Sequence, residues 1–384
     1  MSCFKKVIFL HIIVIFLSSV FIPYKGAAIS NVSAETAILM DFESGRVLYE
    51  KAAHKKMRIA SITKIMTAIL AIESGKLDET VKVSDKAVRT EGSSVYLKPG
   101  EKIKLEHLVY GLMLRSGNDT AVAIAEYIGG SVEGFVFLMN QKAQEIGMRD
   151  TVFSNPHGLD DHENHFSTAY DMAILTKYAM ENETYREISG TKVHKAPNPD
   201  EKWDRSWKNK NKLLTGLYEY STGGKTGFTK RAKRTLVSTA EKDGHDLIAV
   251  TLNGPNDWND HISMFEWGFA QYDLENVVKK GVVHSVKDDF YKGKVVVRRD
   301  FLYPVTDKEK DNLKVEVKLI KPDSNWKKVN DIPAPCGIMI IKLDNKNIGE
   351  IPLYYDKHGK VSQKTWFSNL KEMFLSMIGV HSHG

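Results

Sequence analysis

Strand-like segments stand at both ends of a long, mostly helical stretch of this chain. Two strands are expected around a turn at 43–46 and three more, joined by short turns, follow much later (37–41, 47–49, 221–226, 235–240 and 247–253). Apolar residues recur at helical spacing between them and once after them (105–114, 118–128, 131–146, 168–180 and 263–275). We therefore predict an α+β fold, in which an antiparallel sheet has flanking helices and a helical subdomain.

The composition changes near residues 279–285, and strand-like runs dominate from there (295–297, 313–320, 338–343 and 348–355). With 384 residues, of which 42% are hydrophobic and 27% charged, the chain can form two domains with real cores. We place a main domain at 34–280, a small β-rich domain at 281–360 and an amphipathic helical tail at 361–384.

The first 33 residues have the features of a secretory signal. Lys5 and Lys6 precede an almost wholly apolar run at 7–22, and small residues follow. An uncleaved membrane anchor is the alternative. Export with cleavage would remove Cys3 and leave Cys336 as the only thiol, so that the mature protein could form no intrachain disulfide. We expect the protein at the outer face of the cytoplasmic membrane.

The tail has one apolar helical stripe, with Lys364 and Lys371 off it. The stripe consists of Trp366, Phe367, Leu370, Met373, Phe374, Met377 and Ile378. It is too interrupted to span a bilayer, but it suits a helix lying in a membrane interface. A helix docked on the protein's own core is the alternative. The formal charge of +6 falls to +3 without the signal, which gives no indication of nucleic-acid binding.

Ser61 and Lys64 stand at the start of an apolar helical run, three residues apart and so on one helical face. A buried lysine can lose its proton and act as a base toward a serine hydroxyl. Free N–H groups at a helix N-terminus suit a developing oxyanion. By itself the pair is a weak signal, because Ser is a common cap and Lys a common surface charge.

Two further motifs strengthen that signal. Ser116-Gly117-Asn118 lies between two predicted helices and can direct a hydroxyl and an amide into a cleft. Asn118 or Asp119 is the expected N-cap of the second helix. Lys225-Thr226-Gly227 lies on a strand, where the ammonium and hydroxyl can bind a carboxylate and Gly227 admits a ligand backbone. The order Ser-x-x-Lys, Ser-x-Asn, Lys-Thr-Gly is typical of serine β-lactamases and penicillin-binding proteins.

With these motifs, the stretch from about 35 to 275 resembles the D-alanyl-D-alanine carboxypeptidases, the low-molecular-mass penicillin-binding proteins. The similarity includes the sequence motifs at 60–64, 114–119, 155–160 and 223–227. In overall sequence, the chain most resembles the sporulation-associated members from Bacillus-type bacteria. The resemblance implies removal of the terminal D-Ala from peptidoglycan stem peptides, inhibition by β-lactams and no cofactor. It extends to the β-rich domain and the tail, and suggests a place in the forespore or mother-cell envelope.

The same resemblance assigns roles to individual residues. Ser61 is the nucleophile, Lys64 its proton acceptor and Ser116 the relay to the leaving amine. Asn118 holds the substrate amide, whereas Lys225, Thr226 and Gly227 form the carboxylate-binding strand. The backbone N–H groups of Ser61 and Phe228 form the oxyanion hole.

Four alternatives remain open at this point. A class A β-lactamase would need a Glu-x-x-Leu-Asn segment between Asn118 and Lys225, and the sequence has none. A P-loop ending at Gly224-Lys225-Thr226 would need Gly at 219, where Glu219 stands. A metal site could be drawn from the histidines and acids at 157–165 (His157, Asp160, Asp161, His162, Glu163 and His165), although their spacing fits no zinc motif. A catalytically inactive binding protein would lack Ser61 or Lys64.

Overall fold

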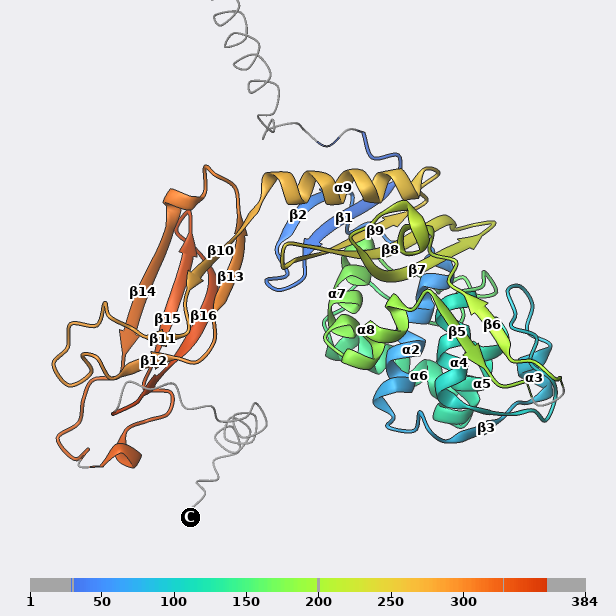
Figure 1. The fold of residues 1–384 in the computed structure, drawn as a ribbon, viewed down its shortest axis with the longest axis horizontal. Helices are drawn as coiled ribbons and strands as arrows, with labels where there is room; N and C mark the ends of the chain where they lie inside the picture. Colours follow the sequence, from blue (N-terminus) through green and yellow to red (C-terminus); the bar gives the residue numbers. More distant parts are fainter. Residues whose placement is uncertain (1–28, 30, 199–200, 327, 358–384) are drawn as a thin grey trace, which may run out of the picture. The chain divides into compact units, whose positions relative to one another are not determined.

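The computed structural model describes residues 29, 31–198, 201–326 and 328–357. The chain divides into two compact units at Tyr272 and Asp273, earlier than the boundary we placed at 280. The expected signal and tail lie outside the described residues. Each unit is considered by itself below (Figure 1).

A five-stranded antiparallel sheet with the order β2-β1-β9-β8-β7 forms the centre of the first unit. Its strands are β1 (Thr36–Asp41), β2 (Val47–Lys51), β7 (Ser221–Thr229), β8 (Lys233–Lys242) and β9 (His245–Leu252). Asp243 and Gly244 both have positive φ in the tight β8–β9 turn, as a two-residue hairpin requires. Strands from the two ends of the first unit therefore pair directly, and β7 is an edge strand.

Helices cover both faces of this sheet, so the side chains of β1 point alternately into two cores. Ile38 and Met40 pack in the larger core with the helical region, whereas Leu39 packs on the other face with Met264 and Phe265. The latter two belong to α9 (Asp257–Gln271), which lies along one face of the sheet, while α7 and α8 lie on the other (Figure 1). The predicted α+β fold is confirmed.

The rest of the first unit is mostly helical, and its Ser-x-Asn segment contacts β7 through the hydrogen bond between Ser116 and Lys225. Its helices are α2 (Lys64–Glu73), α3 (Asp85–Val88), α4 (Leu105–Tyr110), α5 (Asn118–Gly129), α6 (Val132–Glu145), α7 (Ala169–Met180) and α8 (Glu183–Gly190). A 3₁₀ turn η1 (Ala60–Thr63) precedes α2, and π turns occur at η2 (Gly111–Arg115) and η3 (Leu213–Leu217). Two small antiparallel sheets of two strands each complete it, β3–β4 (Thr80–Lys82, Lys102–Lys104) and the hairpin β5–β6 (Val193–Ala196, Arg205–Lys208).

Two local predictions are wrong. Gly117 is the N-cap of α5 and no side chain caps it, because Asn118 and Asp119 use their polar atoms in other contacts. Helix α9 begins before 263, since Asp257 and Asp260 in its first turn suit the positive end of the helix dipole, and 273–275 belong to a strand.

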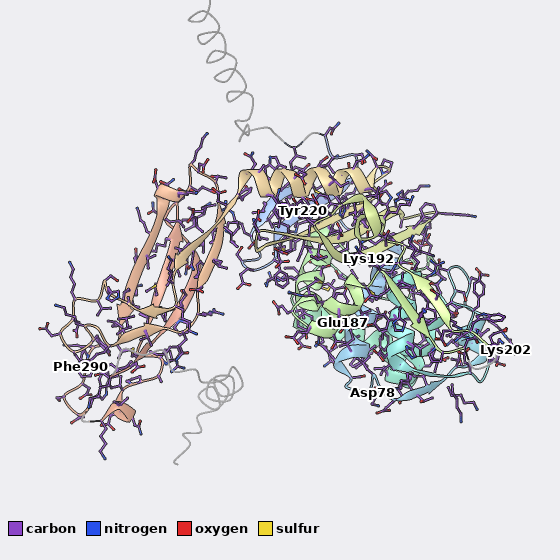
Figure 2. All side chains as sticks on the ribbon, viewed as in Figure 1. Asp78, Glu187, Lys192, Lys202, Tyr220 and Phe290 are labelled. Carbon is purple, nitrogen blue, oxygen red and sulfur yellow. The ribbon has the colours of Figure 1, made fainter. Side chains whose placement is uncertain are left out.

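The second unit consists of β structure. A five-stranded sheet has the order β11-β12-β16-β15-β14, and β10 pairs with β13. The strands are β10 (Asp273–Val278), β11 (Gly281–Val282), β12 (Val295–Val297), β13 (Phe301–Val305), β14 (Leu313–Leu319), β15 (Gly337–Leu343) and β16 (Lys346–Tyr355), with 3₁₀ turns η4 (Lys310–Asn312) and η5 (Val329–Asp331). Phe290 (Figure 2) packs against Tyr291 and Tyr355 at one end of its core, in which Cys336 is buried.

Among the described residues, no single helix is long and apolar enough to cross a membrane. Helices α5 and α6 would reach that length together, but the chain bends by 83° between them.

Candidate active site

The turn that bears Ser61 is fixed through its backbone. Ala60 has φ 49°, in the left-handed region, and its carbonyl accepts a hydrogen bond from Thr63 Oγ1 (2.8 Å). The preceding carbonyl, of Ile59, accepts one from Thr235 Oγ1 on β8 (2.9 Å). A Cβ on Gly158 would fall 1.8 Å from Ala60 O, so only glycine fits there. The sheet and the 154–167 loop thus hold the turn from two sides.

The imidazole of His165 holds this turn through a hydrogen bond to Thr63. Ser154 N donates to its Nδ1 (3.0 Å), so Nε2 carries the proton and donates to Thr63 Oγ1 (2.8 Å). Burial lowers the pKa of His165 to about 4, which keeps the ring neutral at physiological pH. The ring therefore has a structural partner at each nitrogen.

Lys64 is fully buried beneath Ser61, at the first position of α2. Its Nζ lies 3.1 Å from Ser61 Oγ and 2.7 Å from both Asn118 Oδ1 and His157 O. A neutral amine has two N–H donors and one lone pair. Because the two carbonyl oxygens take the N–H groups, the lone pair is left to face the Ser61 hydroxyl.

Electrostatics also favour the neutral amine. Burial is the largest cause, and positive charge on Lys225 or Lys210 adds to it, so that the pKa of Lys64 lies well below its ordinary value. Asp119 opposes the shift, but its carboxylate is committed to the backbone N–H groups of Val95 and Leu97 and to Ser94 Oγ (2.6 Å). The arrangement thus favours the unprotonated amine, the form that a general base requires.

Ser116 and Asn118 reach the site from the break between η2 and α5. Ser116 has φ 63°, which ends the helix and turns its side chain toward Lys225. The side-chain oxygen of Asn118 holds Lys64, and its Nδ2 donates to Glu91 O (2.5 Å). An amide nitrogen has two hydrogens, so one Asn118 N–H is left for a ligand.

Lys225 is the second buried lysine of the site. Its Nζ donates to Ser116 Oγ (3.1 Å) and to Thr226 O (2.7 Å). Burial first, and then the charge of Lys210, lower the pKa of Lys225 to about 7. A carboxylate bound here would restore the charged form, because an opposite charge favours it.

Strand β7 lies against the turn that bears Ser61. A Cβ on Gly227 would fall 2.3 Å from Thr235 Oγ1 and 3.0 Å from Ser61 N, so glycine is required for this approach. Thr226 O faces the site, since it accepts from Lys225 Nζ. Peptide groups of alternate residues face the same edge of a strand, so the Phe228 N–H also faces the site. Ser61 N and Phe228 N are then neighbouring donors.

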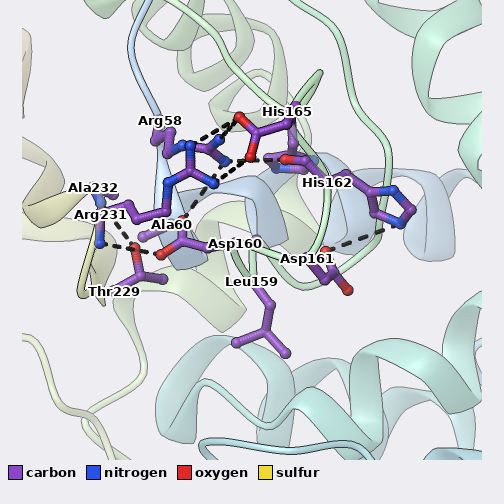
Figure 3. A network of polar contacts seen from close by, with 12 residues as sticks. Arg58, Ala60, Leu159, Asp160, Asp161, His162, His165, Thr229, Arg231 and Ala232 are labelled. Atoms are coloured by element: carbon purple, nitrogen blue, oxygen red, sulfur yellow. Dashed lines mark hydrogen bonds and ion pairs between the residues drawn. The ribbon is translucent and has the colours of Figure 1, made fainter.

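The acids of the suggested metal site are used differently. Glu163 accepts from Arg58 (2.7 Å) and from both terminal nitrogens of Arg231 (2.6 and 2.8 Å), and Asp160 Oδ2 accepts from Arg231 N (3.1 Å) (Figure 3). These contacts tie the 154–167 loop to the β7–β8 turn. Across the described residues, no three His, Cys, Asp or Glu side chains are grouped to hold a metal ion.

The P-loop alternative fails on position, because Lys225 and Thr226 lie inside strand β7 and not in a loop that leads into a helix.

Three residues have roles in the site that the sequence did not predict. Asp119 anchors the 94–97 loop, His165 supports the turn, and Lys210 Nζ, which lowers the pKa of both buried lysines, donates to Ser93 Oγ (3.2 Å). Asp119 directly follows the Ser-x-Asn motif, which was a usable signal. Nothing in the local sequence marked Lys210 among the many lysines.

Two family models match the chain. Residues 24–256 match the model described as D-alanyl-D-alanine carboxypeptidase, and residues 272–360 match the C-terminal domain of penicillin-binding protein 5. The second match agrees with the β-rich unit of the structure.

Individual relatives point the same way. The D-alanyl-D-alanine carboxypeptidase DacF of Bacillus subtilis is 33% identical over 360 residues, which cover 88% of this chain and 89% of the relative. Penicillin-binding protein 5 of Haemophilus influenzae has a similar structure, with a TM-score of 0.68, 26% identity and coverage of 86% of this chain and 98% of that one. The carboxypeptidase DacD of Francisella tularensis gives a TM-score of 0.65 at 27% identity, with coverage of 88% and 95%.

The family match over more than half of the chain and the site described above lead to one conclusion: the chain belongs to the D-alanyl-D-alanine carboxypeptidases, penicillin-binding serine hydrolases of the bacterial cell wall.

Proposed function

We propose that the protein removes the terminal D-Ala from peptidoglycan pentapeptide stems through an acyl-enzyme on Ser61. Lys64 accepts the hydroxyl proton as Ser61 Oγ attacks the carbonyl of the penultimate D-alanine. The oxyanion that forms receives the N–H groups of Ser61 and Phe228. Water then hydrolyses the ester, and the shortened stem can no longer serve as a donor for cross-linking.

The other site residues position the substrate and the leaving group. Ser116, held by Lys225, relays to the departing amine the proton that Lys64 accepted from Ser61, so that Lys64 is neutral again when acylation is complete. The remaining N–H of Asn118 binds the substrate amide, and Lys225 with Thr226 binds the terminal carboxylate. Gly227 lets the peptide approach strand β7 closely.

One observation carries this proposal: Lys64 is fully buried, its two short hydrogen bonds go to carbonyl oxygens, and its third neighbour is Ser61 Oγ at 3.1 Å. The test is mass spectrometry of the intact protein after incubation with penicillin, followed by peptide mapping. We expect one adduct, on Ser61, and none in Ser61→Ala. An adduct on another residue would overturn the assignment.

We also propose that the protein is exported by its first 33 residues and held at the outer face of the cytoplasmic membrane by the apolar stripe of residues 361–384. The resemblance of the sequence to sporulation-associated members of the family supports a role in forming the spore cortex, in the forespore or mother-cell envelope. Comparing the stem-peptide composition of spores with and without the gene tests this role. Identical compositions would argue against it.

A further inference from the structure

The turn that follows the carboxylate-binding strand is strongly cationic. Residues 229–234 contain Lys230, Arg231, Lys233 and Arg234. Two of these charges are compensated, because Arg231 binds Glu163 and Arg234 binds Asp257 (2.7 Å).

Lys230 and Lys233 have no such compensation. Both are exposed, and neither forms an ion pair with any residue that the structure describes. The nearby Asp160 is used by the backbone N–H of Arg231, and Arg58 lies 3.9 Å from it. The turn therefore presents two free ammonium groups to solvent.

The direction of a bound stem peptide follows from the proposed function, on which this inference rests. Its terminal carboxylate lies at Lys225 and Thr226, and its scissile carbonyl lies at Phe228 N. Moving from the carboxylate toward the start of the peptide thus means moving along β7 from 226 to 228 and beyond.

Strand β7 has a free edge, along which an extended peptide can lie. Extended chains advance about 3.3 Å per residue, so the residue before the penultimate D-alanine comes level with Thr229 and Lys230. Lys233 is the register partner of Thr229 on β8. Both lysines therefore lie at the end of β7 that the peptide residue before the penultimate D-alanine reaches.

We propose that Lys230 and Lys233 select stem peptides with a carboxylate on the side chain of the residue that precedes the penultimate D-alanine. The two ammonium groups attract that carboxylate without touching the reacting atoms. Both lysines are exposed, so the selection is modest and decreases with salt.

Two peptides of nearly equal shape test the proposal, acetyl-L-Glu-D-Ala-D-Ala and acetyl-L-Gln-D-Ala-D-Ala. For the wild-type mature protein at low ionic strength we expect kcat/KM to favour the Glu peptide by about three- to tenfold, and the ratio to approach one in 0.5 M salt. The double variant Lys230→Ala/Lys233→Ala should abolish the preference. Lys230→Glu/Lys233→Glu should reverse it, and Lys82→Ala, a change of an exposed lysine on β3, should leave it intact.

The outcomes separate this inference from the proposed function. Equal hydrolysis of both peptides by the wild type, or a preference that survives the charge reversal, overturns the inference alone. It is also overturned if the double variant keeps the preference but loses binding to anionic vesicles, because the turn would then serve a membrane. Failure to hydrolyse either peptide or to take up penicillin would overturn the proposed function instead.

Discussion

Replacing Lys225 by methionine should stabilise the folded protein at neutral pH. Methionine has a similar length and needs no charge, whereas Lys225 is 1% exposed and has a pKa of about 7 instead of the ordinary 10.5. At pH values between these two, the unfolded chain binds a proton that the folded protein does not. Stability of the wild type therefore rises with pH over this window.

The size of the effect follows from the two pKa values. A difference of about 3.5 in pKa destabilises the wild type by about 4 kcal/mol at pH 7, but by less than about 1 kcal/mol at pH 10. Methionine leaves Ser116 Oγ and Thr226 O without a donor, which costs about 1 kcal/mol for each. We expect Lys225→Met to be more stable than the wild type by about 2 kcal/mol at pH 7 and less stable by about 1 kcal/mol at pH 10.

Urea unfolding of both proteins at pH 7, 8.5 and 10 measures this difference. The informative quantity is its change with pH, about 3 kcal/mol, because the lost hydrogen bonds contribute equally at each pH. Lys82→Met, at an exposed position on β3, is the control and should show no such change. A difference between Lys225→Met and the wild type that stays constant from pH 7 to 10 would refute the view that burial displaces the charge of Lys225.

Three other changes test separate parts of the account. Gly158→Ala places a Cβ 1.8 Å from Ala60 O at φ +86°, so it should slow penicillin acylation by more than tenfold and lower stability by at least about 1 kcal/mol; a normal acylation rate would show that the Ser61 turn tolerates displacement. Amidation of the terminal carboxylate of a D-Ala-D-Ala peptide should lower kcat/KM strongly for the wild type and little for Lys225→Met, since only the wild type has the ammonium that binds the carboxylate. An equal loss in both proteins would show that Lys225 does not bind the carboxylate. A chain ending at Lys360 should hydrolyse small peptides normally and no longer float with liposomes, because each large side chain of the tail stripe contributes about 1.5–3 kcal/mol when buried in an interface; loss of activity or of folding would mean that the tail is part of the core.

The sequence was informative wherever chemistry depends on residue type and order. The three motifs predicted which side chains would meet, and the short apolar segments of β1 and β9, each next to a turn, predicted two strands of the sheet. It was less informative where a residue acts through distant contacts, as Lys210 and His165 do. Helix α8 and the β5–β6 hairpin were missed because their residues are largely polar and they are held by packing on neighbours rather than by an apolar pattern of their own.

Asn118 illustrates the same limit. Its residue type suggested both a helix cap and a ligand-binding amide, but the choice depends on Lys64, which lies 2.7 Å from its oxygen and 54 positions away in the chain. A contact of this kind becomes visible only once α2 and α5 are packed together.

The rate of penicillin acylation as a function of pH, in the wild type and in Lys64→Arg, tests whether neutral Lys64 is the base that activates Ser61. If neutral Lys64 is the base, the wild-type rate should reach its plateau well below pH 10.5, because burial lowers the pKa of Lys64 well below that ordinary value. Arginine keeps the charge but cannot lose its proton, so Lys64→Arg should be slower by a factor on the order of a thousand at every pH. A wild-type rate that climbs tenfold per pH unit up to pH 10, or a near-normal rate in Lys64→Arg, would contradict the assignment of Lys64 as the base.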